Sequence, residues 1–152
     1  MSKPKPRAAV IILQDGQIAL LSRNRRGTQY YVFPGGGVDK GETPAEAAAR
    51  EADEELGVQV LVGRMVAEIW FNGQPQYYFL AEITGGTFGA GHGKEMASSS
   101  NSDQGSYQPC WVPISDIRRL PVLPTEVARY VHAACRDGWP EQPLLLRDAT
   151  VD

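Results

Sequence analysis

The sequence is poor in cysteine, has no excess of either charge and contains no long apolar run. Its two cysteines, Cys110 and Cys135, stand far apart, which excludes a disulfide framework and a paired zinc motif and predicts a reduced, cytoplasmic protein. The 15 Lys and Arg residues nearly balance the 18 Asp and Glu residues, so the net charge of −3 predicts no binding to long nucleic acid. The longest apolar run near the start, residues 8–13, is too short to cross a bilayer, so no membrane partner is expected.

What is present is an ordinary globular composition. With 42% hydrophobic and 22% charged residues in 152, the chain is expected to form a single domain over residues 1–152. Apolar and β-branched stretches predict strands at residues 7–13, 17–22, 58–71, 77–83 and 110–112, and helical periodicity predicts helices at 44–56 and 124–135. The glycine- and serine-rich stretch 85–106 is expected to be a long mobile loop. This mixture predicts an α/β protein.

The helix over residues 44–56 has clear start and stop signals. Thr43 is the expected N-cap, Pro44 is the first helical residue, and Glu46 completes a capping box. Gly57 follows the last turn, where a glycine commonly ends a helix. The alanines of this helix form one narrow face, which predicts close packing against a sheet.

Three glutamates, Glu51, Glu54 and Glu55, share one edge of this helix, whereas Glu46 and Arg50 lie on its far side at a spacing that favours an ion pair. Like charges at such spacings destabilise a helix by roughly a few tenths of a kcal/mol per pair, so the cluster needs a compensating partner. A divalent cation such as Mg²⁺ is one such partner, because it takes carboxylate oxygens and bridges them to phosphates. A solvated helix face is the alternative interpretation.

The spacing of residues in and before this helix matches a family motif. The pattern is G-x5-E-x7-R-E-U-x-E-E-x-G-U, where U is apolar, and its fixed positions are Gly36, Glu42, Arg50, Glu51, Glu54, Glu55 and Gly57. This segment, Gly36 to Val58, resembles the Nudix box, with Ala52 and Val58 in the apolar slots. Ala52 is smaller than the usual residue there. Seven fixed positions match by chance on the order of once in a million sequences of this size.

The resemblance to Nudix hydrolases implies an α/β/α sandwich with a mixed central sheet. It implies an enzyme that uses water and Mg²⁺, with Mn²⁺ as the alternative ion, to cleave a nucleoside diphosphate linked to another group. The residues that it assigns to metal binding are Glu51, Glu54, Glu55 and the carbonyl of Gly35. Glu42 and Arg50 match the pair that supports the loop and orients the glutamates.

The box does not determine which carboxylate acts as the general base. Glu95, within the stretch 85–106, is the first candidate, because closure of a loop could bring it to the metal. Glu51 is the alternative inside the box, and Asp103 is a weaker rival. A solvated loop position is the other interpretation of Glu95.

Several residues outside the box are candidates for substrate binding. Arg23 stands at the end of the second predicted strand, ahead of the glycine loop, where related hydrolases often place an arginine on a phosphate; Arg25 and Arg26 could assist it. Tyr31 and Phe33 alternate toward one face and could stack on a base. The remaining aromatic candidates, most of which would simply be core, are Trp70, Phe71, Tyr77 and Tyr78.

The expected function is therefore that of a metal-dependent pyrophosphohydrolase acting on a small nucleotide. A modified nucleoside triphosphate is the first expected substrate, by analogy at the level of the fold. ADP-ribose, nucleotide sugars and dinucleoside polyphosphates are alternative substrates. The sequence leaves open whether the chain forms a homodimer. The rival class is a non-catalytic sensor of a nucleotide metabolite, against which the intact glutamates of the box argue.

Overall fold

The computed structural model describes residues 5–91 and 106–147. Its elements in chain order are β1 (Arg7–Gln14), β2 (Gln17–Arg25), β3 (Thr28–Val32), β4 (Gly35–Gly37), α1 (Pro44–Leu56), β5 (Val58–Phe71), β6 (Gln74–Gly86), β7 (Ser106–Pro113), a 3₁₀ turn (Ile114–Asp116), β8 (Val122–Leu123), α3 (Thr125–Asp137) and β9 (Leu144–Leu146). None of the described helices is long and apolar enough to cross a membrane.

The strands form a curled mixed sheet in which β1 belongs to both halves. In one half, β1 lies between β4, which is antiparallel to it, and β6, which is parallel to it, and β5 and β9 follow β6. In the other half, β2 lies between β3 and β7, and β8 extends the edge beside β3. The halves join through a short pairing of β1 with β2, at Leu13 with Ile18 and Gln14 with Gln17.

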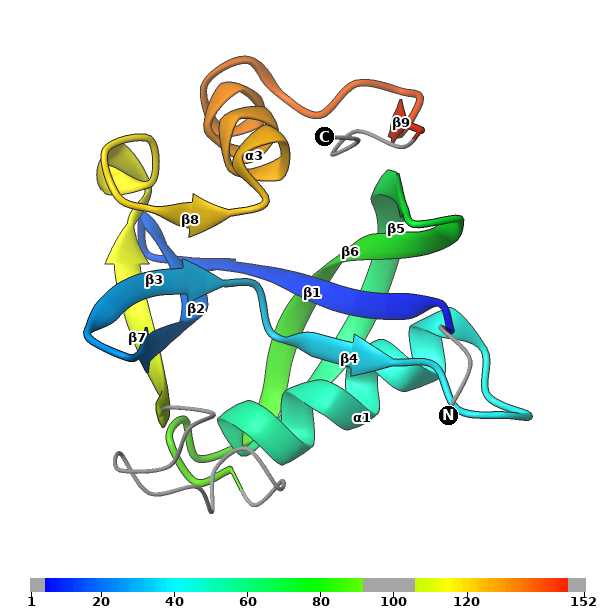
Figure 1. Ribbon diagram of the computed structural model, residues 1–152, viewed down its shortest axis with the longest axis horizontal. Helices are drawn as coiled ribbons and strands as arrows, with labels where there is room; N and C mark the ends of the chain where they lie inside the picture. Colours follow the sequence, from blue (N-terminus) through cyan, green and yellow to red (C-terminus); the bar gives the residue numbers. More distant parts are fainter. Residues whose placement is uncertain (1–4, 92–105, 148–152) are drawn as a thin grey trace.

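The two helices cover opposite faces of this sheet (Figure 1). Because side chains of a strand alternate between faces, β1 serves two cores. Val10 and Ile12 pack in the core under α1, whereas Ile11 packs in the core under α3. Layers of helix, mixed sheet and helix confirm the α/β fold class that the sequence predicts.

Three hairpin turns have the same backbone conformation. Asp15, Arg26 and Asn72 all have positive φ and are each followed by a glycine that also has positive φ, the combination that suits a tight two-residue hairpin. Asp15 followed by Gly16 is also a sequence pair typical of such a turn. The strand predicted at residues 17–22 runs further than expected, because β2 continues to Arg25 in pairing with β3 and β7.

The loop predicted over the glycine- and serine-rich residues 85–106 is shorter than expected, because strands include both of its ends. Gly85 and Gly86 belong to β6, where they pair with Gln59 and Val58, and Ser106 begins β7 by pairing with Asn24. Backbone pairing at both ends outweighs the low strand propensity of glycine and serine there. Residues 92–105, with Glu95 and Asp103, lie outside the described residues.

Helix α1 has the predicted bounds because both of its ends are capped locally. The Thr43 side chain accepts a hydrogen bond from the Glu46 backbone N–H, and the Glu46 side chain accepts one from the Thr43 N–H. At the other end, Gly57 has a φ of 79° and its N–H donates to the Asp53 carbonyl. Neither cap depends on the rest of the fold, which is why sequence alone places this helix correctly.

Gly57→Ala is expected to destabilise the protein by about 2–3 kcal/mol, more than the left-handed conformation alone would cost. A Cβ at Gly57 would lie 2.6 Å from the Ala90 carbonyl carbon, so the added methyl group would collide with backbone. Gly73→Ala is the matched control, because Gly73 has nearly the same φ, 76°, and a methyl group added there would meet no other atom within 4 Å. Urea unfolding of both variants measures the difference, and equal losses would contradict the collision.

Candidate functional site

The site begins where α1 packs against β4. Alanines on α1, among them Ala48 and Ala52, are buried against the sheet, and their small side chains bring the helix backbone close to it. Glu51 and Glu55 follow on the same side and are only 7% and 2% exposed. Burial of an ionised carboxylate is costly unless a hydrogen bond or a cation compensates it. These two glutamates therefore differ from a solvated helix face.

The glycines of β4 receive these carboxylates. The Gly35 N–H donates a 2.8 Å hydrogen bond to Oε1 of Glu55. Gly36 lies against Glu51, and a Cβ there would come within 2.5 Å of the Glu51 carboxylate carbon. Glycine is thus required at this position by close contact with a side chain of the site, since β4 itself is ordinary extended strand.

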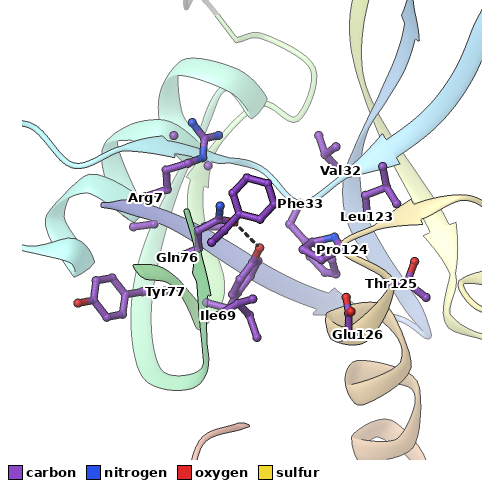
Figure 2. Close-up of a pocket in the computed structure, with 16 residues that line it drawn as sticks. Arg7, Val32, Phe33, Ile69, Gln76, Tyr77, Leu123, Pro124, Thr125 and Glu126 are labelled. Atoms are coloured by element: carbon purple, nitrogen blue, oxygen red, sulfur yellow. Dashed lines mark hydrogen bonds between the residues drawn. The ribbon is translucent and has the colours of Figure 1, made fainter. Parts of the chain in front are cut away.

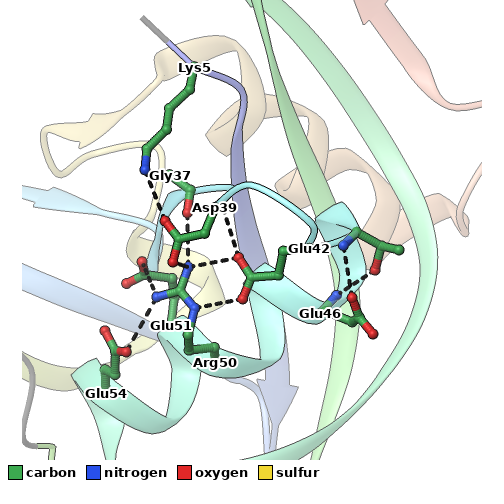
Figure 3. Close-up of polar contacts among 9 residues, drawn as sticks. Lys5, Gly37, Asp39, Glu42, Glu46, Arg50, Glu51 and Glu54 are labelled. Carbon is green, nitrogen blue, oxygen red and sulfur yellow. Dashed lines mark hydrogen bonds and ion pairs between the residues drawn. The ribbon is translucent and has the colours of Figure 1, made fainter. Parts of the chain in front are cut away.

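Arg50 holds the acidic side chains together (Figure 3). Its Nε donates to Glu42 at 2.7 Å, and another nitrogen donates to Glu51 at 3.0 Å and Glu54 at 3.3 Å. The third nitrogen donates to the Gly37 carbonyl at 2.9 Å. The hydrogen bond from Arg50 lowers the pKa of Glu42, and the same bond raises the pKa of Arg50. Both groups stay charged near neutral pH.

The position of Arg50 corrects one expectation from helical spacing. Arg50 and Glu46 do not form the expected ion pair, because Glu46 caps the helix and Arg50 turns toward the loop before it. On the outer side, Asp39 lies 3.5 Å from Arg50 and accepts a 2.9 Å hydrogen bond from Lys5. Sequence reasoning missed Lys5 and Asp39, for which no spacing signal exists.

The donor set suits a hard divalent cation, although the carboxylates do not converge by themselves. All of the side-chain groups offered by Glu51, Glu54 and Glu55 are carboxylate oxygens, the type that Mg²⁺ and Mn²⁺ prefer. Within residues 5–91 and 106–147, no three acidic, histidine or cysteine side chains surround a common point. Arg50 and the Gly35 N–H donate hydrogen bonds to these carboxylates and compensate their charge.

A cavity of about 490 Å³ lies on the other side of β4 (Figure 2). Gly35 and Gly36 line it as well as touching the carboxylates of α1. Its remaining lining residues come from β1, the end of β3 and the residue after it, the β5–β6 hairpin, β8 and the start of α3: Arg7, Ala8, Ala9, Val32, Phe33, Ile69, Phe71, Gln76, Tyr77, Tyr78, Leu123, Pro124, Thr125 and Glu126.

Comparison with known proteins identifies the family. The family model described as "NUDIX domain" matches residues 3–133 of the chain. The chain belongs to the Nudix family. It is 28% identical over 114 residues to an uncharacterised Nudix hydrolase of Bacillus subtilis, a match covering 75% of this chain and 69% of that protein. It is 35% identical over 89 residues to an 8-oxo-dGTP diphosphatase of Haemophilus influenzae, covering 54% of this chain and 65% of that protein.

A solved structure agrees with the Nudix fold. A Nudix hydrolase from Nitrosomonas europaea superposes with a TM-score of 0.68 at 21% identity, covering 96% of this chain and 80% of that one. Nudix hydrolases act on diphosphate bonds and generally use divalent metal ions. The family and the enzyme class predicted from the box are therefore confirmed.

Hydrogen bonds join Arg50 of the Nudix box to Glu42, Glu51 and Glu54, and Glu55 accepts one from the Gly35 N–H. The predicted substrate residues, in contrast, lie in different places. Phe33 lies in the cavity wall, where its ring meets Tyr78 edge to face at 5.6 Å between centroids. Tyr31 is partly buried against the core under α3 and is not among the cavity-lining residues. Arg23 lies over the Tyr107 ring at 4.0 Å and donates to the Tyr30 hydroxyl at 3.0 Å, within the β3, β2 and β7 strands.

Sequence reasoning missed the polar residues of the cavity. Arg7, Gln76 and Glu126 come from three elements that are distant in the chain. The sequence signals are weak: Glu126 is an acidic residue in the first turn of the second predicted helix, and Gln76 is a polar residue between Pro75 and Tyr77. Neither signal indicates which elements meet in space.

Proposed function

We propose that the chain is a metal-dependent pyrophosphohydrolase that cleaves a nucleoside diphosphate linked to another group, with a modified nucleoside triphosphate as the first candidate. The observation that supports this most is the place of β4. Gly35 and Gly36 contact the α1 carboxylates and also line the cavity. A ligand seated in the cavity can thus reach the carboxylates. A nucleotide can contact both the cavity and the carboxylates, because it has a flat base at one end and phosphates at the other.

In this proposal the carboxylates hold the cation. The residues assigned to it are Glu51, Glu54, Glu55 and the Gly35 carbonyl, with Mg²⁺ as the first ion and Mn²⁺ as the second. When bound, the cation supplies charge neutralisation at the diphosphate and lowers the pKa of a water molecule. Arg50, fixed by Glu42, positions Glu51 and Glu54 through its hydrogen bonds.

Other residues bind the nucleotide and accept the proton. Arg23 contacts a phosphate, and Phe33 stacks on the base, with Tyr31 as a second aromatic candidate. Phe33 has the better support, because it lines the cavity. The attacking water loses its proton to Glu95 or, within the box, to Glu51.

Phosphate release from a substrate panel tests the proposal. The panel contains nucleoside triphosphates, modified dNTPs, ADP-ribose, nucleotide sugars, dinucleoside polyphosphates and a 5′-triphosphorylated oligonucleotide, each with Mg²⁺, Mn²⁺ or EDTA, and with added pyrophosphatase. We expect one small nucleotide to dominate in kcat/KM and EDTA to abolish its turnover. Binding without turnover of any member would instead support the sensor.

Glu95→Gln is expected to lower kcat at least about 10-fold, with a smaller change in KM, if Glu95 is the general base. The acidic limb of the pH–rate profile should then disappear, because glutamine does not titrate. Asp103→Asn tests the rival in the same stretch of sequence and should keep wild-type kinetics, whereas loss of the acidic limb in this variant would assign the proton to Asp103. Unchanged pH–rate profiles in both variants would assign the proton to Glu51.

A further inference from the structure

The last turn of α1 is held by a short segment that follows β6. Residues 87–91, the strap, leave β6 and run past the end of α1 (Figure 1). The Gly89 N–H donates a 2.8 Å hydrogen bond to the Leu56 carbonyl. The Thr87 N–H donates a 3.1 Å hydrogen bond to the Gly57 carbonyl. Because the last carbonyls of a helix have no partner inside the helix, the strap supplies partners at the end of α1 that carries two of the box glutamates.

Gly91, the last residue of the strap, lies with its backbone directly against the backbone of α1. A Cβ at Gly91 would be 2.5 Å from the carbonyl oxygen of Glu55 and 2.6 Å from that of Glu54. Both distances are below 3.0 Å, a separation that Cβ atoms essentially never show, and both contacted atoms belong to backbone that cannot rotate away. Gly91 does not have the positive φ that Gly57 has. Close approach alone therefore requires a glycine at this position.

Phe88 anchors the strap to the second half of the sheet. Its ring stacks on that of Trp111 in β7, at 4.7 Å between centroids and 26° between planes. Both side chains pack against the core under α1, and Trp111 lies opposite Ala19 of β2. Because the strap is fixed on the sheet and packed interiors transmit strain, a side chain at Gly91 would displace the end of α1 rather than the strap alone.

The peptide that Gly91 contacts joins two of the carboxylates assigned to the cation. Glu55 is only 2% exposed, and its Oε1 accepts the 2.8 Å hydrogen bond from the Gly35 N–H. Its side chain is thus fixed on β4 while its carbonyl rests on the strap. Displacement of this peptide would move Glu54 and Glu55 relative to Glu51, one turn earlier in α1. Contacts that orient metal ligands commonly contribute about 10- to 100-fold to metal affinity.

We propose that Gly91 is a positioning residue of the cation site. Its bare backbone lets the last turn of α1 rest on the strap, and this contact determines where the carboxylates of Glu54 and Glu55 stand relative to Glu51. The inference rests on the proposed function, in which these carboxylates hold the cation. It adds a residue outside the Nudix box that determines how tightly the cation is bound.

Calorimetric titration of the metal-free protein with Mn²⁺ tests this role without any substrate. Gly91→Ala is expected to bind Mn²⁺ at least about 10-fold more weakly than wild type. Gly85→Ala is the matched control, because the nearest atom to an added methyl group is the end of the flexible Gln59 side chain, at 3.0 Å. Val131→Ala removes volume from the core under α3 and lowers the Tm without touching α1. Both controls should keep wild-type Mn²⁺ affinity.

Phe88→Ala is a second test, because it removes the anchor of the strap without a collision. It should weaken Mn²⁺ binding by a smaller factor than Gly91→Ala, and it decides the question if Gly91→Ala does not fold. Wild-type affinity in the deciding variant, or equal weakening in Val131→Ala, would overturn the inference.

The same titration separates this inference from the proposed function. Mn²⁺ binding that weakens in Gly91→Ala, without turnover of any member of the substrate panel, would overturn the proposed function and leave the positioning role standing. Turnover by wild type with unchanged Mn²⁺ affinity in Gly91→Ala would do the reverse. Failure of wild type to bind Mn²⁺ would overturn both.

Discussion

Glu54→Gln is expected to lower kcat at least about 100-fold while the protein stays folded. In the proposed site Glu54 is a ligand of the cation, so loss of its charge would weaken cation binding, and changes of this kind commonly cost this much. The fold should tolerate the change because the Glu54 side chain is 33% exposed and its contact with Arg50 is long, at 3.3 Å. Arg50 keeps its hydrogen bonds to Glu42, Glu51 and the Gly37 carbonyl.

Steady-state kinetics across a range of Mg²⁺ concentrations measures this effect. The variant should need more Mg²⁺ for half-maximal rate, and its thermal unfolding without metal should match wild type. Glu82→Gln, at an exposed position of β6, is the matched charge control and should behave as wild type. Normal kinetics in Glu54→Gln would remove Glu54 from the site.

Gly36→Ala is expected to reduce kcat/KM by about 100-fold through a collision rather than a lost ligand. The new methyl group would lie within 2.5 Å of the Glu51 carboxylate carbon and 2.9 Å of its Oε1, so the carboxylate has to move. Moving it also disturbs its 3.0 Å hydrogen bond from Arg50. Displacement of a reacting group by about 1 Å can cost on the order of 100-fold in rate.

Gly37→Ala is the matched control for Gly36→Ala. The three atoms nearest to a methyl group at Gly37 all belong to the Lys5 side chain, which is 55% exposed and can move at the cost of its hydrogen bond to Asp39. We expect near-wild-type kinetics there, with a loss of stability below about 1 kcal/mol. Equal activity losses in the two variants would indicate that β4 tolerates no side chain at all and would remove the special role of the Glu51 contact.

Sequence predicts best what is determined locally in this protein. The bounds of α1 follow from its caps at Thr43 and Gly57, and the hairpin turn at Asp15 follows from a turn residue before glycine. Arg50 shows where prediction from local spacing fails. Helical spacing paired it with Glu46, but its partners include Glu42 and the Gly37 carbonyl, which lie outside the helix and are placed by β4 and the following loop.

The residues that line the cavity were harder to predict from the sequence than the ends of α1. Alternation with Tyr31 toward one face identifies Phe33 as a candidate from the sequence, and Phe33 does line the cavity. Glu126 was not identified, because only the pairing of β8 with β3 brings the start of α3 to the far side of β4. A contact set by sheet order between distant segments leaves no periodicity in either segment.

The division of the interior into two cores has a consequence for how this enzyme can change. The carboxylates of α1 rest on one core, whereas the start of α3, with Glu126, rests on the other. Substitutions in separate, non-touching clusters generally combine additively. Substitutions at the start of α3 should therefore add to substitutions on α1 in their effect on stability, so that each face of the sheet can be altered independently of the other.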